Sequence, residues 1–295
     1  MEKVKKILLI LIVLVLICAI GWVSVNFVLS KTDKKSNPVV TMEVEGYGTI
    51  KIELYPDMAP NTVKNFVKLA QRGFYNEKTF TDIEDGLIRG GLTETENSDG
   101  TTKLEGPKTS NLHDLADGEK DTEYSIKGEF IENGFNTNTL SHQRGTISMY
   151  RKTYNDYQQE MAMVKTMGYS SYVDTLLNEL YDSQSGGFFI TTEDKTSLDG
   201  TYAAFGRVTE GMDVVEKISK VELQKSTGDD GTESTTTKPV TAPVIKNVTV
   251  ETYGVDYGDP EVRDLFDFDA IFSMFMQNYM KSSHIFVMLI YFTPF

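Results

Sequence analysis

The sequence has very few of the residues that form covalent cross-links and most transition-metal sites. Its 295 residues include one cysteine, Cys18, and three scattered histidines, His113, His142 and His284. A single cysteine cannot form an intramolecular disulfide, and the histidines lack the spacing of zinc or haem ligands. The sequence therefore excludes a disulfide framework, and it predicts no metal and no cofactor.

Basic charge is also scarce. The chain has 29 Lys and Arg residues against 43 Asp and Glu residues, a formal net charge of −14. An acidic surface repels phosphate groups, so nucleic acid is excluded as a partner class. Apolar residues make up 40% of the sequence, including 15 Tyr and 16 Phe. This is enough material for a sizeable core, in one large domain or two small ones.

A long apolar run occurs at the amino terminus, in residues 7–29. At about 1.5 Å per residue, a helix of this length crosses a hydrocarbon core of about 30 Å. Residues 1–35 are therefore expected to form a membrane anchor and a polar spacer, with the following domain displayed outside the cytoplasm. The expected location is the cell membrane, in a single-pass topology. The alternative is a cleaved signal peptide, although no small-x-small cleavage pattern follows Trp22.

The body that follows has the pattern of a mainly β domain. Residues 39–45 and 49–55 alternate apolar and polar positions around Gly46-Tyr47-Gly48, which predicts a β-hairpin. A helix is expected from Pro60 to a stop at Gly73. Further short strands are expected near residues 79–80, 87–88, 146–150, 187–191, 202–208 and 244–253, with a second helix near 212–220. Many short strands with few helices indicate a closed barrel.

Three segments depart from this pattern. Residues 92–124 and 226–238 are polar and are expected to be solvated or flexible loops. Residues 154–181 have a helical pattern, with an apolar stripe that either packs on its own domain or binds a partner or substrate. The stripe comprises Tyr169, Tyr172, Val173, Leu176, Leu177 and Leu180. The main domain is expected to span residues 36–257, followed by an aromatic tail, 258–295, of unknown role.

The order of several sequence motifs resembles the cyclophilin family of peptidyl-prolyl cis-trans isomerases. The motifs are IELYPDMAPNTVKNFVKLAQRGFY, IRGG, IKGEF, ENGF, RGTISM, GGFFIT and LDGTYAAFGRVTEGMDVVEKI, and the resemblance runs from Val39 to Tyr253. It implies a closed eight-stranded antiparallel barrel capped by two helices, here residues 60–72 and 212–220. It also implies isomerisation of X–Pro bonds, with unfolded or proline-containing polypeptides as partners.

The resemblance also implies where the site lies, and this sequence departs from the family there. Cyclophilins use the arginine of a Phe-His-Arg motif as a donor to the prolyl nitrogen. Here the corresponding residues are Phe80, Thr81 and Asp82, and a carboxylate only accepts hydrogen bonds. Arg89 stands where a glutamine normally precedes the Gly-Gly pair. We therefore consider Asp82 and Arg89 as the candidate catalytic positions.

The proline pocket implied by the resemblance is partly retained. Met149, Phe189 and Leu198 match its apolar positions, although each is also compatible with ordinary barrel core. Phe80, Leu87, Ile88 and Tyr202 complete the predicted substrate-binding set, with Leu87 and Ile88 in place of the usual Phe-Met pair. Two hypotheses follow: a weakened isomerase that assists folding of extracytoplasmic proteins, or a non-catalytic module that binds peptides or proteins on a cyclophilin scaffold.

Overall fold

The computed structural model describes residues 36–96, 102–227, 231–265 and 268–282. The chain divides into two units, one of residues 1–37 with 252–255 and a main unit of Pro38–Glu251 with Asp256–Phe295. The apolar run 7–29 lies outside the described residues. Among those that are described, no helix combines the length and the hydropathy needed to cross a bilayer.

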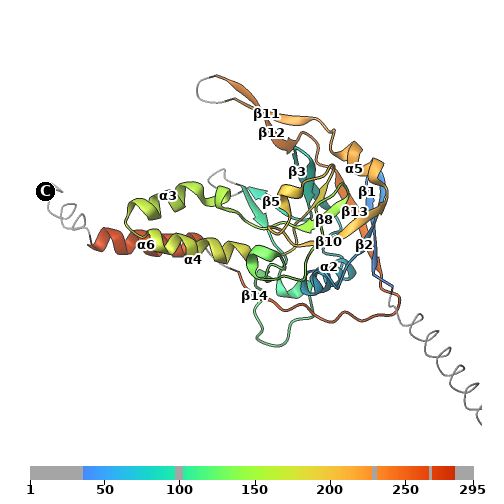
Figure 1. The fold of residues 1–295 in the computed structure, drawn as a ribbon, viewed down its shortest axis with the longest axis horizontal. Helices are drawn as coiled ribbons and strands as arrows, with labels where there is room; N and C mark the ends of the chain where they lie inside the picture. Colours follow the sequence, from blue (N-terminus) through green and yellow to red (C-terminus); the bar gives the residue numbers. More distant parts are fainter. Residues whose placement is uncertain (1–35, 97–101, 228–230, 266–267, 283–295) are drawn as a thin grey trace, which may run out of the picture. The chain divides into compact units, whose positions relative to one another are not determined.

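The main unit is built on a closed barrel of eight antiparallel strands (Figure 1). The strands follow the order β1-β13-β3-β4-β9-β8-β10-β2 around the barrel. Their bounds are β1 Val39–Val44, β2 Gly48–Leu54, β3 Lys78–Glu84, β4 Leu87–Gly90, β8 Thr146–Met149, β9 Phe188–Thr191, β10 Ala204–Glu210 and β13 Val244–Glu251. This confirms the fold predicted from the sequence.

The alternation of apolar residues fixes which face of each strand is buried. In β1 and β2, Met42 pairs with Ile50 and Val40 with Ile52, and all four side chains point into the barrel. A shift of one residue would bring the polar set inside, so this pattern fixes the register. The turn between the strands uses Gly48 at φ 127°, a conformation that favours glycine.

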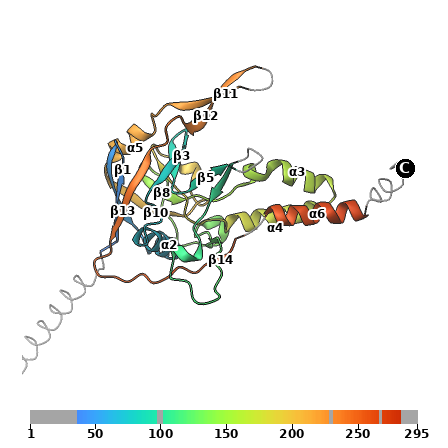
Figure 2. The same ribbon diagram turned by 180° about the vertical axis from the view of Figure 1, so that it is seen from behind.

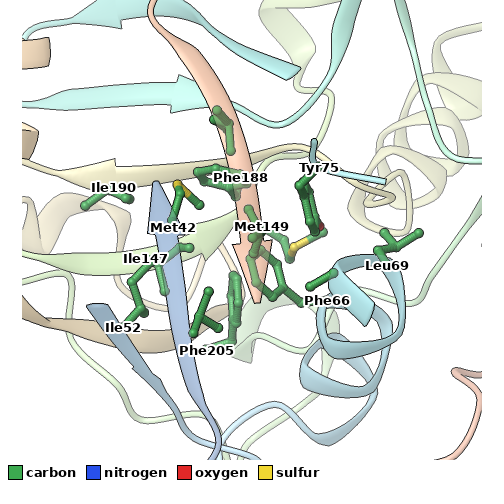
Figure 3. Packing of buried hydrophobic residues seen from close by; sticks show 14 of the residues in the cluster. Met42, Ile52, Phe66, Leu69, Tyr75, Ile147, Met149, Phe188, Ile190 and Phe205 are labelled. Carbon is green, nitrogen blue, oxygen red and sulfur yellow. The ribbon is translucent and has the colours of Figure 1, made fainter. Parts of the chain in front are cut away.

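Two helices close the barrel, α2 (Pro60–Gln71) and α5 (Met212–Ile218), and both lie where the sequence predicts them. From α2, Phe66 reaches the core and stacks on Tyr75 at 4.7 Å between ring centroids (Figure 3). The first turn of α2 receives the Glu129 carboxylate, which accepts hydrogen bonds from the backbone N–H groups of Asn61 (3.0 Å) and Thr62 (2.7 Å). A carboxylate there satisfies donors that have no partner within the helix.

The polar segments 92–124 and 226–238 are not simple loops. The first contains the hairpin β5 (Thr93–Glu96) and β6 (Thr102–Glu105), followed by short η1 (Thr109–Asn111). The second overlaps the hairpin β11 (Leu223–Thr227) and β12 (Glu233–Pro239). The prediction of loops is wrong here because both segments are rich in threonine, a β-branched residue that favours strands even where both faces are polar.

The segment 154–181 is helical and has an apolar cluster of its own. It contains η3 (Tyr154–Tyr157), α3 (Gln158–Thr166) and α4 (Ser170–Tyr181), and α6 (Phe268–Ser282) of the tail packs along α4 (Figures 1 and 2). Phe275 contacts Tyr169 and Tyr172 at 5.3 and 5.2 Å. Met161, Val164, Val173, Leu176 and Leu180 are buried in this cluster. The stripe therefore packs on α3 and α6 rather than in the barrel core.

The tail also adds a short strand to the main unit. Residues of β14 (Arg263–Asp264) pair with β7 (Tyr124–Ser125), and Glu261 exchanges hydrogen bonds with the Asn61 side chain at 2.7 and 2.9 Å. The remaining short helices are η2 (Ile131–Asn133) and η4 (Thr196–Leu198). Part of the predicted tail is thus joined by backbone pairing to β7, outside the barrel, and by side-chain hydrogen bonds to α2.

Candidate functional site

A cavity of about 400 Å³ opens beside strands β4 and β9. Its lining combines apolar, aromatic and charged side chains, which come from β3, β4, β9, η4 and the start of the helical segment. They are Glu84, Leu87, Arg89, Tyr150, Thr153, Asn155, Asp156, Phe189, Leu198 and Tyr202. A cavity of this volume that combines apolar walls with convergent polar groups can hold a small ligand or a peptide side chain.

The period of two in β4 and the register of β9 decide which side chains reach the cavity. Leu87 and Arg89 are half-buried and line it, whereas Ile88 and Gly90 alternate with them and face the barrel core. Arg89 pairs with Phe189 on β9. A cation and an aromatic ring therefore stand side by side on one wall.

Phe189 is held in place by rings on two sides. Tyr202 meets it edge-on, with the ring centroids 5.2 Å apart and the planes at 88°. The imidazole of His142 lies nearly parallel to it at 6.0 Å. Phe189 is only 3% exposed, so its ring is fixed in a largely dry wall.

The imidazole behind Phe189 is buried and bound at both nitrogens. Its Nδ1 lies 2.9 Å from Asp199 Oδ1, and its Nε2 lies 2.9 Å from the Ser148 hydroxyl. Burial lowers the pKa of His142 below its ordinary value, although the Asp199 carboxylate acts in the opposite direction. The neutral ring is therefore the favoured form beside Phe189 at neutral pH.

The guanidinium of Arg89 lies between an aromatic face and a buried carboxylate. Its Cζ lies 4.3 Å from the centre of the Tyr150 ring. Its Nε and Nη2 contact Asp82 Oδ2 at 3.1 and 2.8 Å. The third nitrogen of the guanidinium, Nη1, takes no part in these contacts with Asp82.

Asp82 is ionised despite its burial. Burial alone would raise its pKa, but the charges of Arg89 and Lys238 outweigh this effect and hold the pKa of Asp82 below its ordinary value. In turn, burial acts to lower the pKa of Arg89, while Tyr150 and Asp82 raise it above its ordinary value. Asp82 and Arg89 are thus both charged, and of the two only Arg89 lines the cavity.

The structure brings only part of the predicted site together. Leu87, Arg89, Phe189, Leu198 and Tyr202 line the cavity. The other predicted site residues do not. Phe80, Ile88 and Met149 belong to the barrel core, and Asp82 lies behind Arg89. These placements correct the sequence-based expectation, which took neighbouring motif residues as one surface although alternation sends them to opposite faces.

The residues that the sequence reasoning missed come mainly from the start of the helical segment. Thr153, Asn155 and Asp156 line the cavity together with Glu84. Tyr150 could have been placed, because it follows buried Met149 and alternation turns it to the opposite face. The others depend on how the segment turns away from β8, which no local pattern indicates. Among the described ranges, no cluster of three or more His, Cys, Asp and Glu side chains is arranged to hold a metal ion.

The sequence is similar to several peptidyl-prolyl cis-trans isomerases. A peptidyl-prolyl cis-trans isomerase of Acinetobacter baylyi is 32% identical over 192 residues, which cover 63% of this chain and 74% of the relative. Peptidyl-prolyl cis-trans isomerase B of Bacillus subtilis is 26% identical over 189 residues, covering 64% and 95%. Peptidyl-prolyl cis-trans isomerase-like 2 of Rhizopus delemar is 28% identical over 202 residues, covering 68% of this chain but only 28% of the relative.

A solved structure and a family model also match this chain. The crystal structure of a cyclophilin type isomerase from Cryptosporidium parvum superposes with a TM-score of 0.46 at 19% identity, covering 73% of this chain and 97% of that one. The family described as "Cyclophilin type peptidyl-prolyl cis-trans isomerase/CLD" matches residues 39–166 and 170–250, well over half of the chain. The protein therefore belongs to the cyclophilin-type peptidyl-prolyl cis-trans isomerase family.

Proposed function

We propose that the protein is a peptidyl-prolyl cis-trans isomerase in which Arg89 supplies the hydrogen-bond donor. The observation that supports this most directly is the position of the Arg89 guanidinium, which lines the cavity next to Phe189. Asp82 stands at the position that the family gives to arginine, and its carboxylate binds Arg89 from behind. The donor comes from the neighbouring strand.

The chemistry requires only binding and electrostatics. Rotation about a peptide bond has a barrier of about 18–20 kcal/mol because the nitrogen lone pair is delocalised. A donor aimed at the prolyl nitrogen stabilises the twisted state, in which that lone pair is localised. In this cavity Phe189 and Leu198 would contact the proline ring and exclude water, and Arg89 would donate to the nitrogen.

We expect the activity to be lower than that of a family member with an unpaired arginine. Two of the nitrogens of Arg89 contact Asp82, and the carboxylate offsets part of the positive charge at the cavity. The same pairing favours a second candidate function, a module that binds proline-containing segments without accelerating isomerisation. The two functions share the cavity and differ in whether Arg89 contributes to the rate.

The clients we propose are unfolded or proline-containing polypeptides outside the cytoplasm. The support is the apolar run 7–29, whose length fits a bilayer, and the polar spacer that follows it. External protease applied to intact cells should therefore degrade the body of the protein. Protection of the body in intact cells would contradict this location.

The isomerase proposal can be tested on the full chain in detergent with a proline peptide. Arg89→Met should lower kcat/KM by about 10²–10³, the usual effect of losing one preorganised donor. Arg144→Met is the matched control, because Arg144 is an exposed arginine paired with Glu216 and does not line the cavity. Wild-type activity that Arg89→Met leaves unchanged would contradict the role of Arg89. Peptide binding without any rate acceleration would favour the binding module.

A further inference from the structure

The Asp82 carboxylate is bound on both sides by residues that are distant in the sequence. Its Oδ2 faces Arg89, as described above. Its Oδ1 accepts a hydrogen bond from the Thr237 hydroxyl at 2.9 Å and lies 3.1 Å from Lys238 Nζ. Thr237 and Lys238 belong to β12, which lies beside β3. Each carboxylate oxygen therefore has its own set of partners.

Lys238 also connects this carboxylate to the other polar hairpin, β5 and β6. Its ammonium group contacts Glu94 of β5 as well as Asp82. With Glu84, which lies 3.8 Å from Arg89 Nη2, these residues form a cluster of three anions (Asp82, Glu84 and Glu94) and two cations (Arg89 and Lys238). The Lys238 side chain is 32% exposed and that of Asp82 only 2%, so the cluster reaches from the surface to the back of the cavity wall.

We infer that Lys238 and Thr237 are positioning residues for Arg89, acting through Asp82. With Oδ1 bound to the hairpin, the carboxylate has a fixed orientation and presents Oδ2 to Nε and Nη2 of Arg89. Because two nitrogens of the guanidinium are held in this way, the orientation of the third, Nη1, is fixed as well. The inference rests on the proposed function, because it assigns a purpose to holding Arg89 at the cavity.

Charge balance shows why Lys238 matters more than an ordinary surface lysine. Without it, Arg89 is the remaining cation among the three carboxylates of the cluster. Coulomb attraction between partly buried charges is several times stronger than in water. Arg89 is then drawn more strongly towards Asp82, behind the cavity wall, and its guanidinium is withdrawn from the bound peptide.

The test uses the full chain in detergent and two substitutions that act on Oδ1. Lys238→Met should lower kcat about tenfold with little change in KM, a coupling within the usual range for contacting charged groups. Lys238→Arg should restore kcat, because it keeps the cation. Lys225→Met is the matched control: Lys225 lies on the same hairpin, and its partner Glu233 is exposed. It should leave kcat unchanged.

Two further readouts separate positioning from a merely structural role. In an Arg89→Met background, Lys238→Met should have no additional effect on kcat. The NMR signal of the Arg89 Nε–H group should shift in Lys238→Met and in Thr237→Val, which keeps every charge, but not in Lys225→Met. The inference would be overturned if the Arg89 signal stayed unchanged in both Lys238→Met and Thr237→Val. It would also be overturned if Lys238→Met lowered kcat as much in the Arg89→Met background as in the wild type.

The outcomes also distinguish this inference from the proposed function. If Arg89→Met abolishes activity while Lys238→Met and Thr237→Val leave kcat and the Arg89 signal unchanged, the proposed function holds and the positioning role fails. If the wild-type chain has no isomerase activity, the proposed function fails, and the Arg89 signal alone decides whether Lys238 and Thr237 orient the guanidinium.

Discussion

The ring of Phe189 lies nearly parallel to the buried imidazole of His142, with centroids 6.0 Å apart and planes at 15°. This contact connects the wall of the cavity to the hydrogen-bonded residues His142, Ser148 and Asp199. His142 contacts both Ser148 and Asp199, and neither imidazole nitrogen can rotate away without losing a partner. The position of Phe189 therefore depends on the state of a titratable group behind it.

The first prediction concerns the pH dependence of stability. An unfolded histidine titrates near pH 6.5, whereas burial lowers the pKa of His142 in the folded protein. Below about pH 6.5 the unfolded chain binds more protons at this site than the folded one, so the free energy of unfolding falls as the pH falls. The slope from one such group is at most about 1.4 kcal/mol per pH unit. Chemical unfolding at several pH values should show it.

The variant that checks this prediction is His142→Gln, which should reduce the loss of stability between pH 7 and pH 5.5. A wild-type pH dependence that survives in His142→Gln would show that other groups are responsible.

The second prediction concerns the aromatic wall of the cavity. Phe189→Leu removes the ring that contacts His142 and Tyr202, and it should weaken binding of a proline peptide strongly. Phe74→Leu is the matched control, because Phe74 is a buried aromatic residue of the barrel core that does not line the cavity. Both variants should lose stability, by about 1 kcal/mol or somewhat more. Equal peptide affinity of the two variants in a calorimetric titration would contradict the assignment of Phe189.

The barrel could be predicted because its strands and helices are specified by residues that are close together in the sequence. Alternating residues such as Val40, Met42, Ile50 and Ile52 specify strands, and Pro60 and Gly73 bound a helix. The same periodicity would have separated Leu87 from Ile88, since neighbours on a strand face opposite sides. The family motifs then fixed the order of the strands without any long-range contact.

The site could not be predicted to the same extent because its contacts are not local. Lys238 and Asp82 are far apart in the sequence, and the hairpin that joins them has no apolar alternation to indicate a strand. The register of β3 and β4 is irregular between Phe80 and Asp82, which brings Asp82 opposite Arg89. The acidic character of Asp82 does not reveal that pairing.

The third prediction concerns the helical segment. Its apolar cluster is separate from the barrel core, so replacing residues 158–179 with a short Gly/Ser loop should leave the barrel folded. Tyr181 has to stay, because its ring contacts Phe130 at 5.4 Å. Circular dichroism during heating should show one cooperative transition for the shortened chain. Loss of cooperative unfolding would mean that α3 and α4 are part of the barrel's folding unit.

The last prediction concerns substitutions that exchange the charged residues Asp82 on β3 and Arg89 on β4. From the sequence alone, Asp82→Arg should restore the family arginine and raise the activity. The structure argues against this for the single substitution, because Asp82 is buried between Arg89 and Lys238. A third cation there would repel both and remove the carboxylate that they share, and breaking a buried ion pair typically costs about 3–5 kcal/mol.

The double variant Asp82→Arg with Arg89→Gln relieves most of this conflict, because the number of cations stays at two and Lys238 keeps Glu94 as a partner, although the Asp82 carboxylate is lost. It also reproduces the order that the family uses, arginine on the first strand and glutamine before the Gly-Gly pair. We therefore expect the double variant to recover most of the stability lost by Asp82→Arg and to isomerise X–Pro peptides at least as fast as the wild type. Thermal unfolding and kcat/KM, measured on both single variants and the double, provide the check. A double variant as unstable as Asp82→Arg alone would show that Lys238 tolerates only a carboxylate at this position.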